Sequence, residues 1–158
     1  MPDTSVLVRP AREEDRLPLA VLFAEIAEER DGIATEPPVD IEMRAARWVL
    51  EGMFVATTTD DVIGMIHLEP SRHGYCDVAL AVARHWRGRG VGTALFAAAI
   101  AWARDHGCHK LSLSVFAHNA AAIGLYRKLG FVEEGRRVEH YRRQSGELWD
   151  SIDMGLPL

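Results

Sequence analysis

The sequence has only two cysteines, Cys76 and Cys108, among its 158 residues. Two cysteines cannot form a disulfide framework, and the first residues, MPDTSVLVRP, lack the basic start and apolar core of a secretory signal. We therefore expect a cytoplasmic protein in a reducing environment. Long apolar runs are also missing, since the longest, Ala94–Ala103, is about half the length that crosses a bilayer. That run predicts a buried helix and no membrane partner.

Positive charge is in deficit, because 18 lysines and arginines are outnumbered by 23 aspartates and glutamates, for a net charge of −5. An acidic chain is poorly suited to a nucleic-acid backbone, so no nucleic-acid partner is expected. The hydrophobic fraction of 48% and the charged fraction of 26% are typical of a globular protein. Repeats, linkers and low-complexity segments are missing as well, which favours one domain over residues 1–158.

Hydrophobic periodicity predicts an alternation of strands and helices, and hence a mixed α/β fold. Strands are expected at Ser5–Arg9, Met53–Thr58, Val62–Leu68, Tyr75–Ala83 and Leu111–Val115, and a final hairpin at Phe131–Val138 and Trp149–Met154. Helices are expected at Asp15–Arg30, Asp40–Leu50, Val91–Arg104 and Asn119–Leu129. Asp40 is suited to cap the second helix, and Gly130 to end the last one in a left-handed conformation.

The most informative segment lies between the strand that ends near Val82 and the helix that begins at Val91. Three glycines alternate there, at Gly88, Gly90 and Gly92, and three arginines accompany them, at Arg84, Arg87 and Arg89. Glycines allow positive φ and close approach of a ligand, while the first N–H groups of the helix stay unpaired. The segment therefore predicts an anion site at a helix N-terminus.

Two familiar phosphate-binding loops fit this segment poorly. A Walker A loop needs Gly-Lys before Ser or Thr, and the sequence contains no Gly-Lys, which argues against a nucleotide phosphotransferase. A dinucleotide fingerprint counted from Gly88 would require glycine where Thr93 stands. Its acidic ribose ligand is missing too, since Asp105 follows a helix rather than a second strand. A glycine-rich turn without a ligand is the remaining alternative.

The run Arg87-x-x-Gly90-x-Gly92 matches the Arg/Gln-x-x-Gly-x-Gly/Ala signature of a known family. Downstream, Asn119-x-x-Ala-x-x-Leu-Tyr126-x-Lys-x-Gly-Phe131 is similar to that family's second signature, and the start, Arg9-Pro10-Ala11 with Asp15, is typical of it. The chain thus resembles the GNAT superfamily of acyl-CoA-dependent N-acyltransferases over nearly its whole length.

The resemblance implies a fold, a cosubstrate and a reaction. The fold would be a mostly antiparallel sheet of six to seven strands, splayed between strands 4 and 5 and flanked by about four helices. Acetyl-CoA would be the cosubstrate, with no metal, and a primary amine of a small amino compound or a protein N-terminus would attack it directly in a ternary complex. A homodimer is common among such proteins. The residues expected to bind the cosubstrate are Leu80, Ala81, Val82, Arg87, Gly88, Arg89, Gly90, Val91, Gly92, Thr93, Asn119 and Tyr126.

The resemblance also makes Tyr126 the candidate acid that serves the leaving thiolate, although its position on an apolar helix face equally suits a core residue. The general base is open. Asp77 and Glu69 flank the strand pair on the acceptor side, His67 is a third candidate, and a water chain without a dedicated base is an equal alternative. A non-catalytic acyl-CoA-binding or sensing module is the rival function, disfavoured because Tyr126 and Asn119 are both present.

Two clusters of charge give opposite hints about the acceptor. Acidic residues in the first helices would favour a cationic amine: Glu25, Glu28, Glu29, Glu36, Asp40 and Glu42. Basic residues in the final hairpin would favour a carboxylate: Arg136, Arg137, Arg142 and Arg143. The run His106-Gly107-Cys108-His109 superficially resembles a metal site, but no second cluster completes a tetrahedron, so a helix-to-strand turn is expected.

Overall fold

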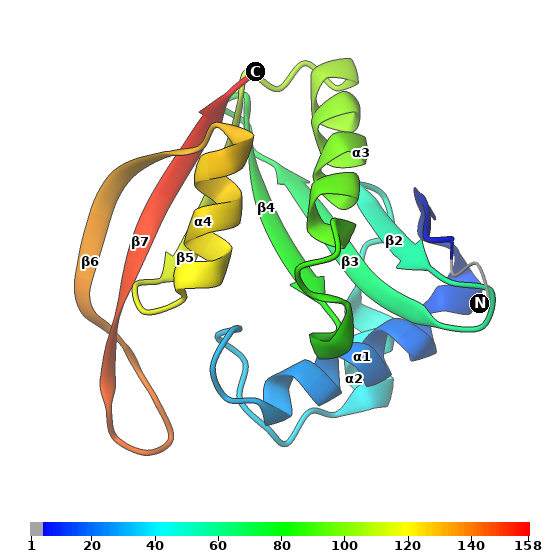
Figure 1. Cartoon of the computed structure of the whole chain (residues 1–158), viewed down its shortest axis with the longest axis horizontal. Helices are drawn as coiled ribbons and strands as arrows, with labels where there is room; N and C mark the ends of the chain where they lie inside the picture. Colours follow the sequence, from blue (N-terminus) through cyan, green and yellow to red (C-terminus); the bar gives the residue numbers. More distant parts are fainter. Residues whose placement is uncertain (1–4) are drawn as a thin grey trace.

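The computed structural model describes residues 5–158 and contains a seven-stranded sheet in the order β1-β2-β3-β4-β5-β7-β6 (Figure 1). The strands are β1 (Leu7–Pro10), β2 (Met53–Thr57), β3 (Val62–Pro70), β4 (Tyr75–Val82), β5 (Lys110–Phe116), β6 (Val132–Arg142) and β7 (Leu148–Pro157). The helices are α1 (Arg16–Glu28), α2 (Ile41–Arg47), α3 (Val91–Asp105) and α4 (Ala120–Leu129), with short 3-10 turns η1 (Glu13–Asp15) and η2 (Arg84–Trp86). The predicted order of elements is confirmed, with shifts of a few residues at several ends.

The sheet consists of two antiparallel halves joined by a single parallel pair. β3 and β4 stay in register from Gly64 opposite Val82 to Pro70 opposite Cys76. In contrast, β4 and β5 pair only over Tyr75–Asp77 and Lys110–Ser112, and then diverge (Figure 1). The expected splay between the fourth and fifth strands is therefore confirmed.

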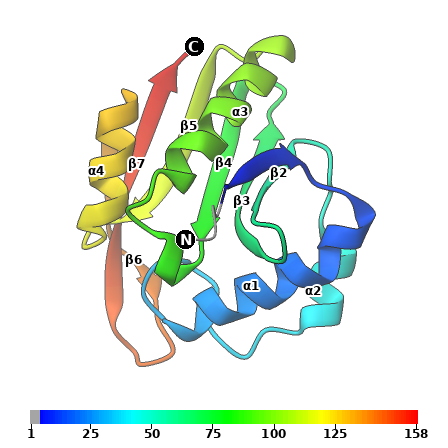
Figure 2. The same ribbon diagram turned by 45° about the vertical axis from the view of Figure 1, so that its right-hand side comes forward.

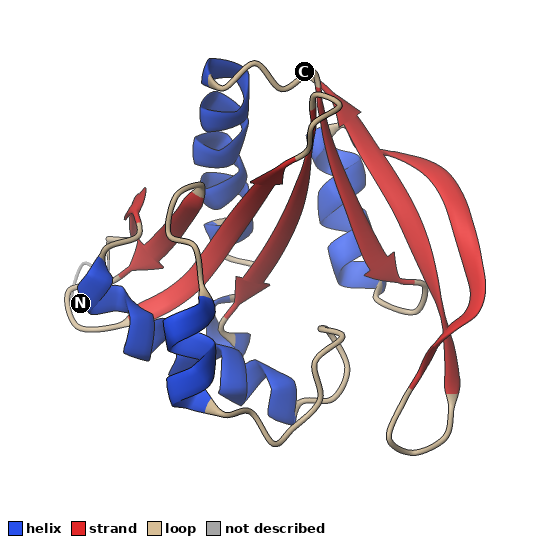
Figure 3. Cartoon of the chain, turned by 180° about the vertical axis from the view of Figure 1, so that it is seen from behind, coloured by secondary structure: helices blue, strands red, loops and turns tan. Residues whose placement is uncertain are grey.

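Helices cover both faces of the sheet, but unevenly. Seen from behind, α1 and α2 lie in front of the N-terminal half, whereas α3 and α4 lie on the opposite face (Figure 3). Strand alternation explains this arrangement: on β5, Leu111, Leu113 and Val115 enter the main core, while Ser112 and Ser114 face the other side. No helix among the described residues is long and apolar enough to cross a bilayer.

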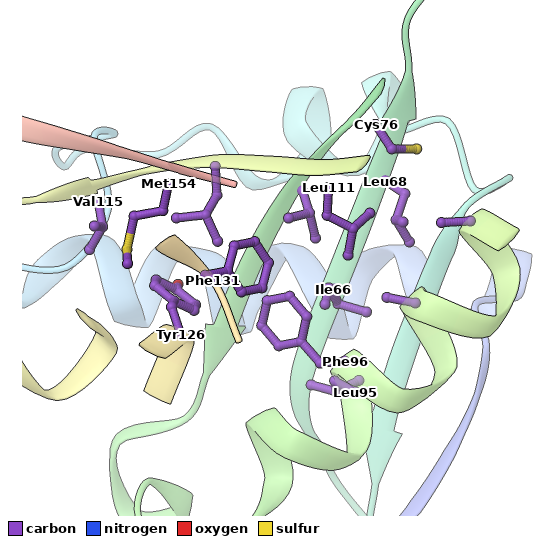
Figure 4. Packing of buried hydrophobic residues seen from close by; sticks show 14 of the residues in the cluster. Ile66, Leu68, Cys76, Leu95, Phe96, Leu111, Val115, Tyr126, Phe131 and Met154 are labelled. Atoms are coloured by element: carbon purple, nitrogen blue, oxygen red, sulfur yellow. The ribbon is translucent and has the colours of Figure 1, made fainter. Parts of the chain in front are cut away.

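The main core lies between the sheet and the helices α3 and α4 (Figure 4). Leu95 and Phe96 of α3 are fully buried there against Ile66 of β3 and Leu111 of β5. Burying one such side chain stabilises the fold by roughly 1.5–3 kcal/mol. The core thus holds α3, and with it the loop that precedes this helix, in a fixed position on the sheet.

Local capping signals are found where the sequence predicts them. The Asp40 carboxylate accepts from the N–H of Met43 at 3.0 Å, and Gly130 ends α4 with φ of 104°. However, α2 ends at Arg47, short of the expected Leu50. The reason is a tertiary contact. Nη1 of Arg16 donates hydrogen bonds to the carbonyl oxygens of Ala45 and Trp48 at 2.7 and 2.8 Å, and Trp48 has an extended backbone conformation.

A buried ion pair ties β1 to the start of α1. The Arg9 guanidinium donates to both carboxylate oxygens of Asp15, at 2.7 and 3.0 Å, and the N–H of Arg12 donates to the same group at 2.7 Å. Hydrogen bonding from Arg9 lowers the pKa of Asp15 below its ordinary value. The carboxylate form of Asp15 is therefore part of the folded state.

We predict that Asp15→Asn lowers the free energy of unfolding by roughly 2 kcal/mol at pH 7, because it leaves the Arg9 charge without its partner. Since the pKa of Asp15 is lower in the folded state, its contribution is present above about pH 4 and is lost as pH falls through the folded-state pKa. Urea unfolding of the two proteins at several pH values should show the gap narrowing with acid. Glu14→Gln, at an exposed neighbour, is the control, and an equal gap at every pH would contradict the assignment.

Candidate active site

A cleft of about 1170 Å³ opens where β4 and β5 part. One wall is the β4 edge from Val78 to Val82, and the other is formed by the end of β5 and the inner face of α4. Because β4 and β5 pair only as far as Asp77 and Ser112, the facing backbone edges beyond that point have no strand partner. Unpaired edges require hydrogen-bonding partners, so this cleft is suited to an extended ligand that carries amide groups.

The glycine loop lies at the end of this cleft where α3 begins. Gly88 and Gly90 have φ of 73° and 84°, and a Cβ at either position would meet no atom within 4 Å. Gly90 caps α3 without a side-chain hydrogen bond. The cap thus leaves the first N–H groups of α3 without a side-chain partner, the arrangement on which the predicted anion site depends. Gly92 has a steric role, because its Cβ would lie 2.9 Å from a Leu125 methyl group of α4.

Arg87 is already paired in this structure. Its Nε donates to the Val82 carbonyl at 3.0 Å, and its two Nη groups donate to the Glu29 carboxylate at 2.7 and 2.8 Å. Arg87 thus joins the end of β4 to the segment that follows α1. Every residue expected to bind the cosubstrate lines the cleft except Arg89, whose guanidinium lies 5.2 Å from the ring centre of Trp86.

Tyr126 of α4 belongs to the core and to the cleft at once. Its ring packs edge-on against Phe96 at 5.8 Å and lies 5.7 Å from Phe131, and the residue is 8% exposed (Figure 4). It is also one of the residues that line the cleft. Burial raises the pKa of Tyr126 to about 12, so the phenol keeps its proton throughout the neutral range. The two roles that the sequence left open are compatible.

The structure does not bring the three candidate bases into the cleft with Tyr126. Asp77 and Glu69 are opposite each other in the β3–β4 pair, and Asp77 lines a separate, smaller pocket of about 480 Å³. Burial, and then the charge of Glu69, raise the pKa of Asp77. Burial lowers the pKa of His67, which lies 3.7 Å from Glu69.

Two segments far apart in the chain both line the cleft, the loop between α1 and α2 and the β6–β7 hairpin (Figure 2). Arg143 joins them and is only 4% exposed. Its Nη1 donates to the Ala34 carbonyl at 2.9 Å, and its Nε lies 3.6 Å from the Glu36 carboxylate. The guanidinium also lies over the Trp149 ring at 4.4 Å. One buried cation thus fixes the loop against the hairpin.

Among the described residues, one ion pair joins the two charge clusters that gave opposite hints about the acceptor, and two of the other hairpin arginines are paired within the hairpin. Glu36 meets Arg143, and the hairpin arginines Arg136 and Arg137 bind Asp150 and Asp153 on β7. The sequence pattern places Arg143 in one group with Arg136, Arg137 and Arg142, and this grouping gives no sign that Arg143 is its buried member. The nearby aromatic residues were its only local signal.

We predict that Arg143→Ala lowers the free energy of unfolding by about 3 kcal/mol, because it removes the partner of Glu36 and the packing on Trp149. Arg142→Ala removes an exposed neighbour and should stay within about 0.5 kcal/mol of the parent. Thermal or urea unfolding of both variants measures the difference. Equal stabilities would show that the buried guanidinium does not hold the two segments together.

Comparison with known proteins agrees with this geometry. The model of the acetyltransferase (GNAT) family matches residues 20–131, so the chain belongs to this family of acetyltransferases. It is 33% identical over 108 residues to the L-amino acid N-acetyltransferase AaaT of Escherichia coli (strain K12), which is 63% of this chain and 64% of that protein. The chain therefore spans slightly less than two thirds of that relative's length.

Solved structures show the same fold. The ribosomal-protein-alanine N-acetyltransferase from Brucella melitensis superposes with a TM-score of 0.87 and 29% identity, over 96% of this chain and 99% of that one. A putative acetyltransferase from Salmonella typhimurium, yncA, whose structure contains its cofactor acetyl-CoA, gives a TM-score of 0.85 at 22% identity, over 97% and 94% of the two chains.

Proposed function

We propose that this chain transfers an acetyl group from acetyl-CoA to a primary amine of a small amino compound or a protein N-terminus, by direct attack in a ternary complex. The observation that supports it most is the cleft between β4 and β5, which has a free helix N-terminus at one end and two unpaired strand edges along its length. These features suit the phosphates and the amide-containing arm of coenzyme A. Family membership supports the same choice.

The residues present fit this cosubstrate. The N–H groups at the start of α3, with Gly88 and Gly90 leaving open space, would hold its phosphates. Backbone groups from Leu80 to Val82 would bind its arm. Asn119 also lines the cleft, although its side chain already caps α4 by accepting from the N–H of Ala122 at 3.2 Å. Coenzyme A would bring the thioester, and the chain would supply orientation and charge stabilisation.

In the reaction, the neutral amine nitrogen attacks the thioester carbonyl carbon, a C–N bond forms and the C–S bond breaks. The carbonyl oxygen gains negative charge, which a backbone N–H on the free β4 edge would stabilise. The leaving thiolate is met by the Tyr126 hydroxyl. With a pKa of about 12, the phenol is a weaker acid than a thiol of about 8.5, so it acts chiefly as a hydrogen-bond donor to the developing thiolate.

The proton of the amine would leave through water. Asp77 and Glu69 are the candidates to receive it, since the raised pKa of Asp77 brings its basicity closer to neutral pH. Both lie outside the cleft, so any role they have is indirect. Positioning of the two substrates supplies the larger share of the acceleration in such a reaction, roughly 7–11 kcal/mol.

Calorimetry should show that acetyl-CoA binds the wild-type chain. Arg87→Ala should weaken binding about tenfold or more, because Arg87 holds the glycine loop against Val82 and carries charge at the phosphate end. Gly90→Ala should weaken it too, since φ of 84° strains an alanine. Arg104→Ala, in the last turn of α3, is the matched control. A folded wild-type chain that binds no acetyl-CoA would refute the proposed function.

Tyr126→Phe should lower kcat about 10- to 100-fold at saturating amine, because it removes a hydrogen-bond donor to the developing thiolate, while acetyl-CoA binding changes little. The ring and its packing on Phe96 are kept, so the thermal midpoint should stay close to that of the parent. Free-thiol release measures turnover, and calorimetry measures donor binding. Unchanged kcat would remove Tyr126 from the mechanism. Donor binding without turnover of any amine, in the wild type, would instead favour a non-catalytic acyl-CoA-binding module.

A further inference from the structure

Ser151 of β7 has a buried hydroxyl that no protein group satisfies. Within residues 5–158, only two buried side-chain polar atoms lack a hydrogen-bond partner, Ser151 Oγ and Arg143 Nε. Arg143 still donates hydrogen bonds through its other nitrogens, whereas Oγ, the single polar atom of the Ser151 side chain, has no hydrogen-bond partner. Ser151 is 1% exposed and lines the cleft. Buried hydroxyl groups are normally hydrogen-bonded, so an unpartnered one in a binding cleft points to a ligand atom.

Strand register places this hydroxyl on the acceptor side of the sheet. Ser151 is opposite Phe116 of β5 and Arg137 of β6. The next residue, Ile152, enters the main core beneath α4, so Ser151 faces away from that helix. The hydroxyl therefore lies on the wall that faces the loop between α1 and α2.

Two polar neighbours of Ser151, Ser114 and Arg137, already have partners. The Ser114 hydroxyl donates to Asp153, and Nε of Arg137 donates to the same carboxylate at 2.9 Å. Nearby, the Arg143 guanidinium lies 5.1 Å from the Phe116 ring and 4.4 Å from the ring of Trp149. Ser151 thus keeps a buried hydroxyl without a protein partner beside Ser114 and Arg137, whose polar groups are already paired.

We propose that Ser151 Oγ donates a hydrogen bond to a carbonyl or carboxylate oxygen of the acceptor, which makes the acceptor an α-amino carbonyl compound. The proposal rests on the acetyl transfer proposed above. The other buried polar atom without a partner, Arg143 Nε, is also a donor, which favours an oxygen over a second ammonium group as the ligand atom. A free amino acid and a peptide N-terminus share this oxygen beside their amine. The opposite wall, with Phe23, Ile26 and Ile33, offers apolar surface to a side chain.

Four leucine-like acceptors test the proposal with acetyl-CoA: L-leucine, L-leucinamide, the peptide Leu-Gly-Gly and 3-methylbutylamine, which lacks the oxygen. For Ser151→Ala we expect kcat/KM to fall about 5- to 100-fold for the acceptors that contain the oxygen, and to change less than twofold for 3-methylbutylamine. Comparing each acceptor between variant and parent cancels differences in amine basicity. L-Leucine against L-leucinamide and the peptide distinguishes a free amino acid from a chain terminus.

Stability provides a second readout, because Ser151→Ala removes no protein hydrogen bond. Its thermal midpoint should equal or exceed that of the parent, whereas Ser114→Ala loses the bond to Asp153 and should lower the midpoint. A lower midpoint for Ser151→Ala, or the same kcat/KM change for all four acceptors, would overturn the proposal. Turnover of 3-methylbutylamine alone would overturn it and leave acetyl transfer intact. Failure to bind acetyl-CoA would remove the proposed function itself.

Discussion

The short parallel pairing of β4 with β5 is the constraint on which the rest of the site depends. Three residues on each strand hold the two half-sheets together, and beyond Asp77 the strands part. α3 and α4 pack on the sheet side by side and meet through Phe96 and Tyr126, so one continuous core supports both sides of the gap. The free strand edges, the exposed start of α3 and the position of Tyr126 at the cleft all follow from that divergence.

The segment after α1 connects the parts of the site that the divergence separates. Glu29 binds Arg87 at the glycine loop, Asp31 binds His118 between β5 and α4 at 2.8 Å, and Glu36 meets Arg143 at the hairpin. An exposed ion pair such as Asp31–His118 contributes little by itself. Arg143 differs because it is buried and cannot lose its partners without cost. The glycine loop and the hairpin are thus joined through one short loop.

Local chemistry determined what could be predicted from the sequence. Asp40, Asn119 and Gly130 are caps whose signals lie within four residues, and the glycine loop is equally local. The early end of α2 was missed because Arg16, about thirty residues away in the sequence, donates hydrogen bonds to the carbonyl groups at the end of this helix. The burial of Arg143 was missed because its partners, Ala34 and Glu36, lie about 110 residues away. In addition, a register shift between Arg137 and Tyr141 interrupts the strand alternation before Arg143.

The loop after α1 meets the hairpin through residues about 110 positions apart, such as Arg143 with Ala34 and Gln144 with Arg30. Contacts of such long sequence separation form late, because a long loop must close before they stabilise anything. During synthesis the N-terminal half-sheet and the glycine loop emerge well before β7. The glycine loop is therefore made before the hairpin that completes these contacts, so the two ends of the cleft form in sequence rather than together.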